Sequence, residues 1–354
     1  MKNNIYQSSL DLTGDSYYFY YKNKKKEIVP VLDTNLNALA KQKLNEIEKN
    51  YTDIPSAFKL NFKDVKLYHP KGDIEKAHSL IINPQNGAYS LKNKLNHLTG
   101  KEWTKFTCSW FIFNALKSDL KEEKELVGDS DSHPATFSPT MIEDFIKFFT
   151  KENDKVFDPF SGIGSTLEAA KRTNRVGYGI ELNEKYFNMI KKRLPEFKDN
   201  IFNDDSRNLK NLNLPKFNYS ISSPPYWDVL NRSTDGFKKN RIEKNLDYNY
   251  SNNPIDLGNI DDYNQFLNDL TKIYEDMYDF LVDGAYITII IKNVKKEGKL
   301  YPIAWDLASK LSSTYVLKDE KIWIQDKIAL SPYGYPYSWA SNILHHYCLI
   351  LRKE

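Results

Sequence analysis

The feature that most limits the fold is a regular alternation of short apolar runs and amphipathic segments beyond about Lys101. The apolar runs have the length of strands, and the segments between them have the length and spacing of helices. Such alternation is typical of an α/β fold with a doubly wound, mostly parallel sheet. Strands are predicted at 155–160, 176–182, 201–205, 217–223 and 284–294, and helices at 138–149, 165–173, 184–194 and 263–281.

Both ends of the chain depart from this alternation. Two apolar runs, at 321–330 and 345–353, flank a turn with proline and glycine, and they predict an antiparallel hairpin that finishes the sheet. Near the start, 17–32 predicts two strands joined by a lysine-rich turn, and 35–49 predicts a helix. We therefore expect an N-terminal α+β region over residues 1–100 and a larger α/β domain over residues 101–354.

Composition narrows the class of protein. The chain has 354 residues and a net charge of +3, so a nucleic-acid partner would need a local basic surface. Its two cysteines, Cys108 and Cys348, form no CxxC pair, which argues against a zinc site and fits a reducing compartment. No apolar run reaches the roughly 18 residues of a membrane span, and the first residues lack the apolar core of a signal peptide. These features predict a cytoplasmic protein with no membrane partner.

A glycine loop stands where α/β folds bind ligands. The segment DPFSGIGSTLEAA places Asp158 at the end of a predicted strand, with Gly162 and Gly164 before a helix. Glu181 ends the next strand and can accept both hydroxyls of a ribose. Leu167 replaces the third glycine of the dinucleotide fingerprint, so a ligand with a ribose but no pyrophosphate fits better than NAD. S-adenosylmethionine is the leading candidate.

A third acidic position follows the third predicted strand. Asp205, in FNDDSRNL, can accept a hydrogen bond from an adenine amino group, and Asp204 is the alternative if the register differs by one residue. An isolated DDS is more often a helix N-cap. The series Asp158, Glu181 and Asp205, each after its own strand, favours the ligand interpretation.

The run FNYSISS ends in Ser-Pro-Pro-Tyr-Trp, although proline cannot continue a strand. An amino group on a base is a poor nucleophile, because its lone pair is delocalised into the ring. Two fixed acceptors, the carbonyl of Pro224 and the side-chain oxygen of Ser223, would localise that lone pair. Tyr226 would offer a face on which the base stacks. The prolines are therefore interpreted as holding acceptors in place.

These motifs resemble those of the DNA amino-methyltransferases, which act on cytosine N4 or adenine N6. The resemblance covers about Lys101 to Lys353 and includes HPATFS (133–138), which is similar to a further cofactor segment of that family. It implies a Rossmann-like methyltransferase domain that uses S-adenosylmethionine, with Ser223, Pro224, Pro225 and Tyr226 as catalytic residues. The implied cofactor-binding residues are His133, Pro134, Phe137, Asp158, Pro159, Phe160, Gly162, Gly164, Ser165, Thr166, Glu181, Leu182, Asp205 and Ser206.

Two segments are candidates for contacts with double-stranded DNA. The loop 228–261 follows the tetrapeptide directly, where phosphates beside a flipped base must pass. Its basic residues are Arg232, Lys238, Lys239, Arg241 and Lys244. The N-terminal region 1–100, with YKNKKK at 21–26, is the second candidate and an accessory or target-recognition region.

Several alternatives stay open at this level. Serine at the first tetrapeptide position and Trp227 after it favour cytosine N4 over adenine N6 within the family. An RNA guanine N2 methyltransferase and an inactive specificity subunit are further alternatives. The chain has no Pro-Cys dipeptide for attack by a thiol, and His345 and His346 alternate along a strand, so no metal pair is expected. It carries no nuclease signature, so any restriction endonuclease partner would be a separate protein.

Overall fold

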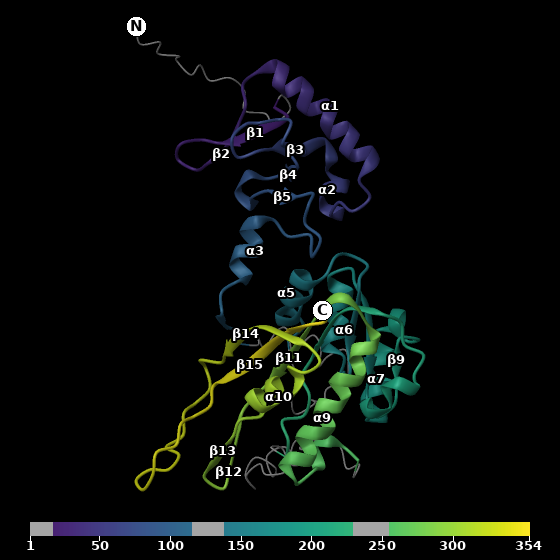
Figure 1. Ribbon diagram of the computed structural model, residues 1–354, viewed down its shortest axis with the longest axis vertical. Coiled ribbons are helices and arrows are strands. Elements are labelled where there is room, and N and C mark those ends of the chain that lie inside the picture. The colour runs from purple at the N-terminus through teal and green to yellow at the C-terminus, as the bar shows by residue number, and fades with distance from the viewer. Residues whose placement is uncertain (1–16, 115–137, 229–254) are drawn as a thin grey trace. The chain divides into compact units, whose positions relative to one another are not determined.

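The computed structural model describes residues 17–114, 138–228 and 255–354 (Figure 1). The chain forms two compact units, Met1–Thr107 and Cys108–Glu354. Each unit has its own sheet.

The N-terminal unit is built on a five-stranded sheet in the order β2-β1-β3-β4-β5. Its strands are β1 (Phe19–Lys22), β2 (Ile28–Pro30), β3 (Lys66–Tyr68), β4 (Ser79–Ile81) and β5 (Tyr89–Ser90). Its helices are α1 (Thr34–Asn50), α2 (Ser56–Leu60) and α3 (Gly100–Phe106). β1 and β2 pair antiparallel across the lysine-rich turn. Helix α1 buries Ala40, Leu44 and Ile47 in the core of this unit, which accounts for the apolar spacing seen in the sequence.

The second unit contains an eight-stranded sheet in the order β6-β14-β15-β11-β10-β7-β8-β9. Its strands are β6 (Trp110–Ile112), β7 (Lys155–Asp158), β8 (Val176–Ile180), β9 (Ile201–Phe202), β10 (Phe217–Ser222), β11 (Leu281–Ile291), β14 (Val316–Ile324) and β15 (His345–Arg352). The five strands from β11 to β9 run parallel, and β15 is antiparallel to both β11 and β14. The predicted mostly parallel α/β sheet with an antiparallel hairpin is confirmed.

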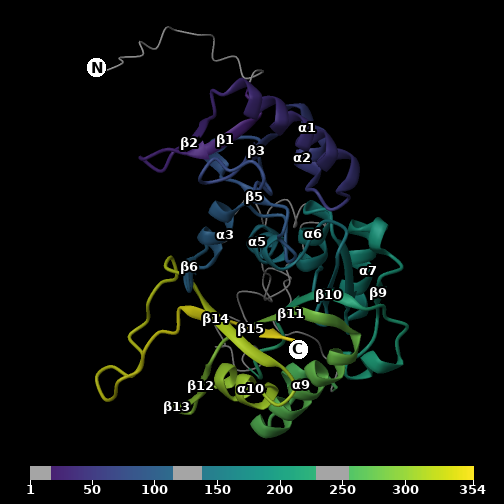
Figure 2. The same cartoon turned by 45° about the horizontal axis from the view of Figure 1, so that its top comes forward.

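Helices cover both faces of this sheet (Figure 2). One face carries α5 (Pro139–Phe149), α6 (Ser165–Arg172) and α7 (Glu184–Arg193), and the other carries α9 (Tyr263–Met277) and α10 (Ile303–Leu311). Short 3-10 helices lie at Phe62–Asp64, Pro84–Asn86, Pro195–Phe197, Ser206–Asn211, Leu257–Asn259 and Tyr278–Phe280. None of the helices in the described ranges is long and apolar enough to cross a bilayer.

The C-terminal part differs from the prediction in three ways. Helix α10 was not predicted, although Ile303, Leu307 and Leu311 repeat every four residues and are fully buried. Strand β14 ends at Ile324, because the chain leaves the sheet for a long connection over 325–344. The hairpin does not finish the sheet, since β6 pairs parallel with β14 at the outer edge. Short apolar stretches such as β6 carry too little periodic signal to be placed from the sequence.

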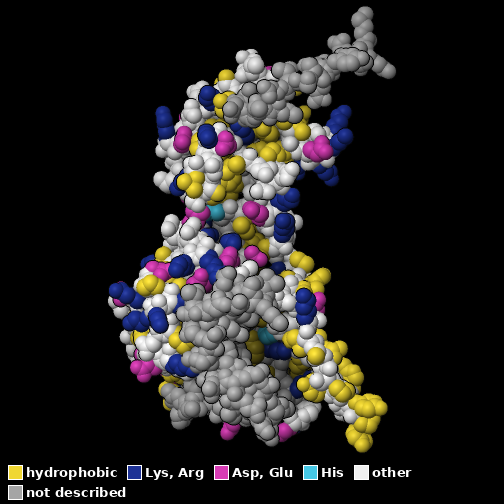
Figure 3. All heavy atoms as spheres, turned by 180° about the vertical axis from the view of Figure 1, so that it is seen from behind, with side chains coloured by type: hydrophobic (Ala, Val, Ile, Leu, Met, Phe, Trp, Pro, Cys, Tyr) yellow, Lys and Arg dark blue, Asp and Glu magenta, His cyan; other side chains and the backbone are white. Residues whose placement is uncertain are grey.

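Two hairpins extend from the second unit. The connection 325–344 between β14 and β15 projects from it, and hydrophobic side chains cover much of its surface (Figure 3). A smaller hairpin pairs β12 (Val294–Lys296) with β13 (Lys299–Tyr301).

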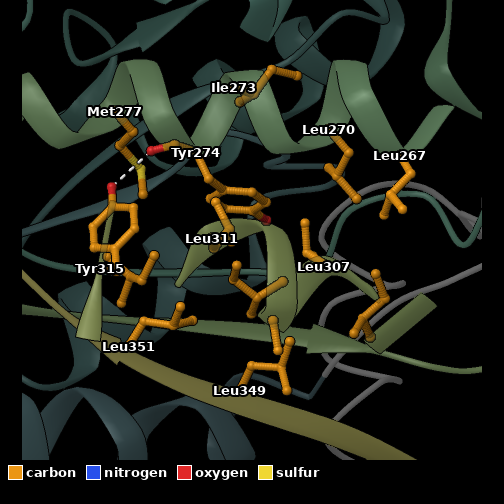
Figure 4. Close-up of a cluster of buried hydrophobic side chains, with 14 of the residues drawn as sticks. Leu267, Leu270, Ile273, Tyr274, Met277, Leu307, Leu311, Tyr315, Leu349 and Leu351 are labelled. Carbon is orange, nitrogen blue, oxygen red and sulfur yellow. Dashed lines mark hydrogen bonds between the residues drawn. The ribbon is translucent and has the colours of Figure 1, made fainter. Parts of the chain in front are cut away.

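The main core lies between the sheet and the helices α9 and α10 (Figure 4). Tyr274 of α9 contacts this core, and its carbonyl accepts a 2.7 Å hydrogen bond from the hydroxyl of Tyr315. Since α9 follows the segment 229–254, which lies outside the described residues, this packing fixes where the chain re-enters the described structure. The re-entry brings residues 255–257 to the carboxyl ends of the strands, where the candidate site lies.

Candidate functional site

The glycine loop after β7 is shaped by two residues with left-handed backbone. Gly162 has φ +55° and Gly164 has φ +86°, and Gly164 is the N-cap of α6. A Cβ at position 164 would lie 3.1 Å from the side chain of Ile190 on α7, in addition to its backbone strain. The amide of Gly164 donates to the carbonyl of Ser161 at 2.7 Å. The loop therefore turns tightly and presents backbone at the start of a helix.

Asp158 holds this loop from inside. Its side chain is buried and accepts hydrogen bonds from the amide of Phe160 (2.9 Å) and from the hydroxyl of Thr166 (2.6 Å). Burial raises the pKa of the Asp158 carboxyl to about 6, against the opposing effect of these two bonds. The carboxyl lines the same cavity as the glycines. Asp158 therefore combines a structural role in the loop with a negative charge beside the cavity.

Glu181 follows β8 and bridges two loops. One carboxylate oxygen accepts from the amide of Gly162 at 2.7 Å, and the other accepts from the amide of Asn183 at 2.8 Å. A carboxylate has about four lone-pair sites, so about two stay free for a ligand. Burial raises the pKa of Glu181 to about 8, the nearby carboxyls of Asp256 and Asp158 raise it further, and the two backbone bonds oppose them. This side chain is thus a partly satisfied buried acid in the cavity wall.

Gly179 was not predicted to belong to the site, although the loop needs it. Gly179 lies in β8 directly against Ser161, and a Cβ at position 179 would overlap the Ser161 hydroxyl oxygen. The amide of Ser161 also donates to the carbonyl of Ile180 at 3.0 Å. The glycine in the strand therefore allows the loop to pack onto β8, a close approach of the kind that a glycine inside a strand indicates.

Asp205 has the geometry of a helix N-cap. Its carboxylate accepts from the amide of Arg207 at 2.9 Å and forms an ion pair with the guanidinium of Arg207. The fallback residue, Asp204, accepts from the amide of Asp205 and from the side-chain amide of Asn208. Asp205 nevertheless lines the cavity, as does Ser206, whose hydroxyl donates to the carbonyl of Pro159. A role for Asp205 toward an adenine amino group stays a prediction.

The tetrapeptide begins one residue after β10 ends. The hydroxyls of Ser223 and Tyr226 lie 3.0 Å apart and form a hydrogen bond. Ser223, Pro225 and Tyr226 line the cavity, and Pro224 is buried. The preceding residue is anchored as well, since the Ser222 hydroxyl bonds to that of Tyr274 at 2.8 Å. The segment therefore holds its first and last side chains together at the edge of the cavity.

Trp227 faces away from that edge. It has φ +55°, is only 2% exposed, and packs against the rings of Tyr263 and Tyr301. A left-handed backbone at a bulky residue costs roughly 1–2 kcal/mol, so burial of the indole must offset that cost. Because the backbone at Trp227 is left-handed, the side chain of Tyr226 lies at the cavity and that of Trp227 lies in the core.

His346 of β15 supports Tyr226, a role that sequence reasoning did not assign. Its ring centroid lies 5.7 Å from that of Tyr226 and stacks on Trp323 of β14 at 4.3 Å. Burial, together with Lys292 and His345, lowers the pKa of His346 to about 3, so the ring is neutral near pH 7. Within the described ranges, no group of three or more His, Cys, Asp or Glu side chains could hold a metal ion.

One cavity brings these elements together. It is lined by the glycine loop, the segments after β8, β9 and β10, and Ile255–Leu257, which the sequence interpretation had not placed at the cofactor. The described lining carries four carboxyl groups and no Lys, Arg or His; the carboxyls belong to Asp158, Glu181, Asp205 and Asp256. Among the described residues, the buried hydroxyl of Ser165, also in this lining, has no hydrogen-bond partner.

The lining suits S-adenosylmethionine. Its carboxyl groups, of which Asp205 is paired with Arg207, favour a ligand that donates several hydrogen bonds over a phosphate. S-adenosylmethionine carries a positive sulfonium, a ribose diol and amino groups, and has no phosphate. The unpartnered Ser165 hydroxyl adds a polar atom that a ligand can satisfy. The residues present fit this cofactor.

Some predicted site residues lie outside the described residues. These are the cofactor candidates His133, Pro134 and Phe137, and the DNA-contacting candidates Arg232, Lys238, Lys239, Arg241 and Lys244. Pro159, Phe160 and Leu182 are described and line the cavity.

A protein-family model described as DNA methylase matches residues 2–192, just over half of the chain. The match includes the glycine loop and Glu181, and it ends before the tetrapeptide. The chain is 39% identical over 122 residues to the type II methyltransferase M.HindIII of Haemophilus influenzae, covering 34% of this chain and 36% of that protein. It is 38% identical over 80 residues to M.BglII of Bacillus subtilis, covering 23% of this chain and 22% of that protein.

The chain therefore spans about a fifth to a third of the length of these curated relatives. Among solved structures, TrmN from Thermus thermophilus is similar over 62% of this chain and 50% of that chain, with 16% identity and a TM-score of 0.38.

Proposed function

Because the chain belongs to this DNA methylase family, we propose that it is a site-specific DNA methyltransferase that uses S-adenosylmethionine and modifies the exocyclic amino group of a base. The observation that carries the proposal is the meeting of two motifs in one cavity. Ser223 and Tyr226 stand on the same cavity as Asp158, Glu181 and the glycine loop. A cofactor held by the second group would thus adjoin acceptors suited to an amino group.

When bound, S-adenosylmethionine supplies a methyl group on a positively charged sulfur. The loop residues and Glu181 would hold it, with the free lone pairs of Glu181 accepting from the ribose diol. The ionised carboxyl groups of the lining favour its positive charge, and Asp158, whose pKa is about 6, is ionised near pH 7. This arrangement contributes by positioning and by electrostatic complementarity, which supply most of the rate enhancement in direct group transfer.

Ser223 and Tyr226 would prepare the amino group. If the Ser223 hydroxyl donates to the Tyr226 oxygen across their 3.0 Å contact, the lone pairs of Ser223 are left to accept an amino hydrogen. The carbonyl of Pro224 would accept the second hydrogen. With both hydrogens engaged, the lone pair on the amino nitrogen is localised and aimed. The ring of Tyr226, backed by His346, would then be the face for the base.

We propose cytosine N4 as the acceptor in preference to adenine N6. The support is Ser223 at the first position of the tetrapeptide with Trp227 after it, a combination more frequent among cytosine enzymes of this family. A hydroxyl accepts more weakly than a carboxylate, and both can serve either base. The choice therefore rests on resemblance rather than on the geometry of the cavity.

DNA would be held by basic residues. Those of the segment 228–261 lie outside the described residues, and its described part, Asp228 and 255–261, carries no Lys or Arg and reaches the cavity lining at 255–257. In the N-terminal unit, the turn between β1 and β2 exposes Lys22, Lys24, Lys25 and Lys26, which supports a role in target recognition. A type II relative such as M.HindIII suggests a modification system in the cytoplasm with a separate restriction endonuclease.

The test is incubation of the purified chain with methyl-labelled cofactor and separate pools of DNA and RNA. We expect label in DNA only, and nucleoside mass spectrometry should identify N4-methylcytosine. Label in RNA only would overturn the DNA assignment. N6-methyladenine without N4-methylcytosine would overturn the base assignment alone. Failure to bind S-adenosylmethionine in calorimetry would favour an inactive specificity subunit.

A further inference from the structure

The connection between β14 and β15 displays aromatic side chains that globular proteins usually bury. Tyr333, Tyr335, Tyr337 and Trp339 are 61%, 81%, 94% and 88% exposed. We call residues 331–341 the aromatic tip. Figure 3 shows hydrophobic side chains gathered over this projecting hairpin. A cluster of exposed aromatic rings on one element marks an interaction surface rather than scattered apolar exposure.

Hydrogen bonds hold the aromatic tip in a defined turn. Ser331 and Asn342 are joined by two hydrogen bonds across the hairpin, of 2.8 and 3.0 Å. Gly334 has φ +79°, and its carbonyl accepts from the amides of Tyr337 and Ser338 at 2.8 and 2.7 Å. The rings are thus presented on a hydrogen-bonded frame, which lowers the entropy lost when they bind a partner.

Cations stand at the base of the aromatic tip. Lys295 of β12 donates to the carbonyl and the hydroxyl of Ser341 at 2.6 and 3.0 Å, and its amine lies 5.8 Å from the ring centroid of Trp339. The β12–β13 hairpin contains Lys295, Lys296 and Lys299 against a single Glu297, and residues 327–344 contain no Asp or Glu. Exposed rings beside a hairpin with three lysines and one glutamate fit a polyanion with flat faces.

The aromatic tip is also continuous with the catalytic segment. Residues 342–344 connect it to β15, where the ring of His346 packs against Tyr226. Lys296, next to Lys295, contacts the ring of Trp227 and pairs with Asp228 at 3.0 Å. Seven residue steps separate Trp339 from His346, so the Cα atom of Trp339 lies within about 25 Å of that of His346. That distance is about seven base pairs of DNA at 3.4 Å each.

We propose that the aromatic tip is a DNA contact that stacks its rings on bases or sugars within about seven base pairs of the target base. The proposal rests on the proposed function, since it takes DNA as the substrate. Stacking suits any base, because every base has a π face, and alanine substitution of a stacking ring costs about 5- to 150-fold in affinity. The lysines of β12–β13 would meet the flanking phosphates.

The test compares three variants with the wild type in methylation assays on a cognate duplex. In Tyr337→Ala/Trp339→Ala, both changed side chains are almost fully exposed, so folding should be unaffected. We expect the KM for DNA to rise at least 10-fold, with kcat at saturating DNA and the Kd for S-adenosylmethionine within twofold. Tyr337→Phe/Trp339→Phe keeps the rings and should retain most of the affinity. Leu317→Ala, an exposed apolar change at the other end of β14, is the matched control.

Duplex length adds a second readout. The difference between wild type and the alanine variant should shrink as the duplex is shortened to fewer than about seven base pairs on each side of the target. A KM for DNA within twofold of the wild type would overturn the inference while the proposed function stands. A wild-type enzyme that transfers no methyl to DNA would overturn both. Dissociation of a dimer, or loss of binding to anionic phosphatidylglycerol vesicles, with KM for DNA unchanged would assign the rings to those partners instead.

Discussion

The cavity and the aromatic tip lie on the same sheet and are opposite in character. The cavity is lined by buried carboxyl groups that accept backbone hydrogen bonds, whereas the aromatic tip is exposed and free of carboxylates. A small cation that must be held in one orientation needs enclosed, directed acceptors. A long polyanion needs rings and cations on a surface that it can reach. The contrast suggests that this unit separates cofactor recognition from polymer recognition, and that Tyr226 stands between them.

The largest expected effect is the loss of turnover when Tyr226 is changed. Tyr226→Ala removes both the stacking face and the hydroxyl that bonds to Ser223, so turnover should fall by at least about 100-fold, within the range for lost positioning. Tyr226→Phe keeps the face and should lose less. Cofactor affinity, measured by calorimetry, should stay within about threefold for both variants. Turnover of the alanine variant close to that of the wild type would mean that the tetrapeptide serves only as a strand exit.

The next largest expected effect is on cofactor affinity alone. In Glu181→Gln, an amide replaces the carboxylate that accepts from Gly162 and Asn183, so fewer lone pairs stay for a ribose and the negative charge is lost. The cost should be on the order of 1–3 kcal/mol, or about 5- to 150-fold in the Kd for S-adenosylmethionine. The KM for DNA should change little. Glu184→Gln, an exposed change at the start of α7, is the control, and equal cofactor affinities in the two variants would place the ribose acceptor elsewhere.

Cofactor affinity should depend on pH through Glu181, which belongs to the cavity and not to the aromatic tip. The pKa of Glu181 is raised from 4.5 to about 8, so below pH 8 the unliganded carboxyl is protonated and must lose its proton to accept from a ribose. Cofactor affinity should therefore rise with pH, by about 10-fold from pH 6.5 to 8, and then level off. Glu181→Gln should remove this slope. An equal slope in that variant would contradict the assignment.

The same group has the opposite effect on the stability of the unliganded protein. A raised pKa in the folded state gives stability that is fully present below pH 4.5 and is lost as the pH rises through about 8. Thermal unfolding without cofactor should show this contribution declining over that window. Residues 331–341 contain no Asp, Glu, His, Lys or Arg, so the aromatic tip should add no comparable dependence.

The smallest expected effect comes from changing the backbone of the aromatic tip while its rings remain. In Gly334→Ala, a Cβ meets the carbonyl of Ser338 on a left-handed backbone, so the turn must change while its rings remain. We expect the KM for DNA to rise about two- to fivefold, with no change in cofactor affinity or in kcat. Gly284→Ala, which also has a positive φ but whose Cβ would meet the flexible side chain of Arg352 rather than backbone, is the control. A change in cofactor affinity in Gly334→Ala alone would show that the two regions are coupled.

Much of the sheet could be predicted because its strands are buried on both faces. β7, β8 and β10 contain no exposed residue and are rich in Val, Ile, Phe and Tyr, and helices α6, α7 and α9 carry apolar stripes with clear starts. Two elements were missed. Helix α10 does carry an apolar stripe of Ile303, Leu307 and Leu311, which the prediction did not use. Strand β6 has only three residues, two of them exposed at the sheet edge, so its position depends on its pairing with β14, which no local pattern contains.

The sequence by itself determined the types of residue in the site and the strand ends at which they stand. Asp158, Glu181 and Ser223 each follow an apolar run, and parallel topology brings such ends to one edge. Tertiary structure alone decided how those residues are used: Gly179 admits Ser161 against β8, His346 arrives from the far end of the chain to support Tyr226, and Trp227 turns into the core. The physical reason is the separation along the chain of the residues that set each feature. Strand ends follow from local apolar patterns, whereas a close approach, a stacked ring or a raised pKa depends on atoms that are distant in the chain and meet only when it is packed.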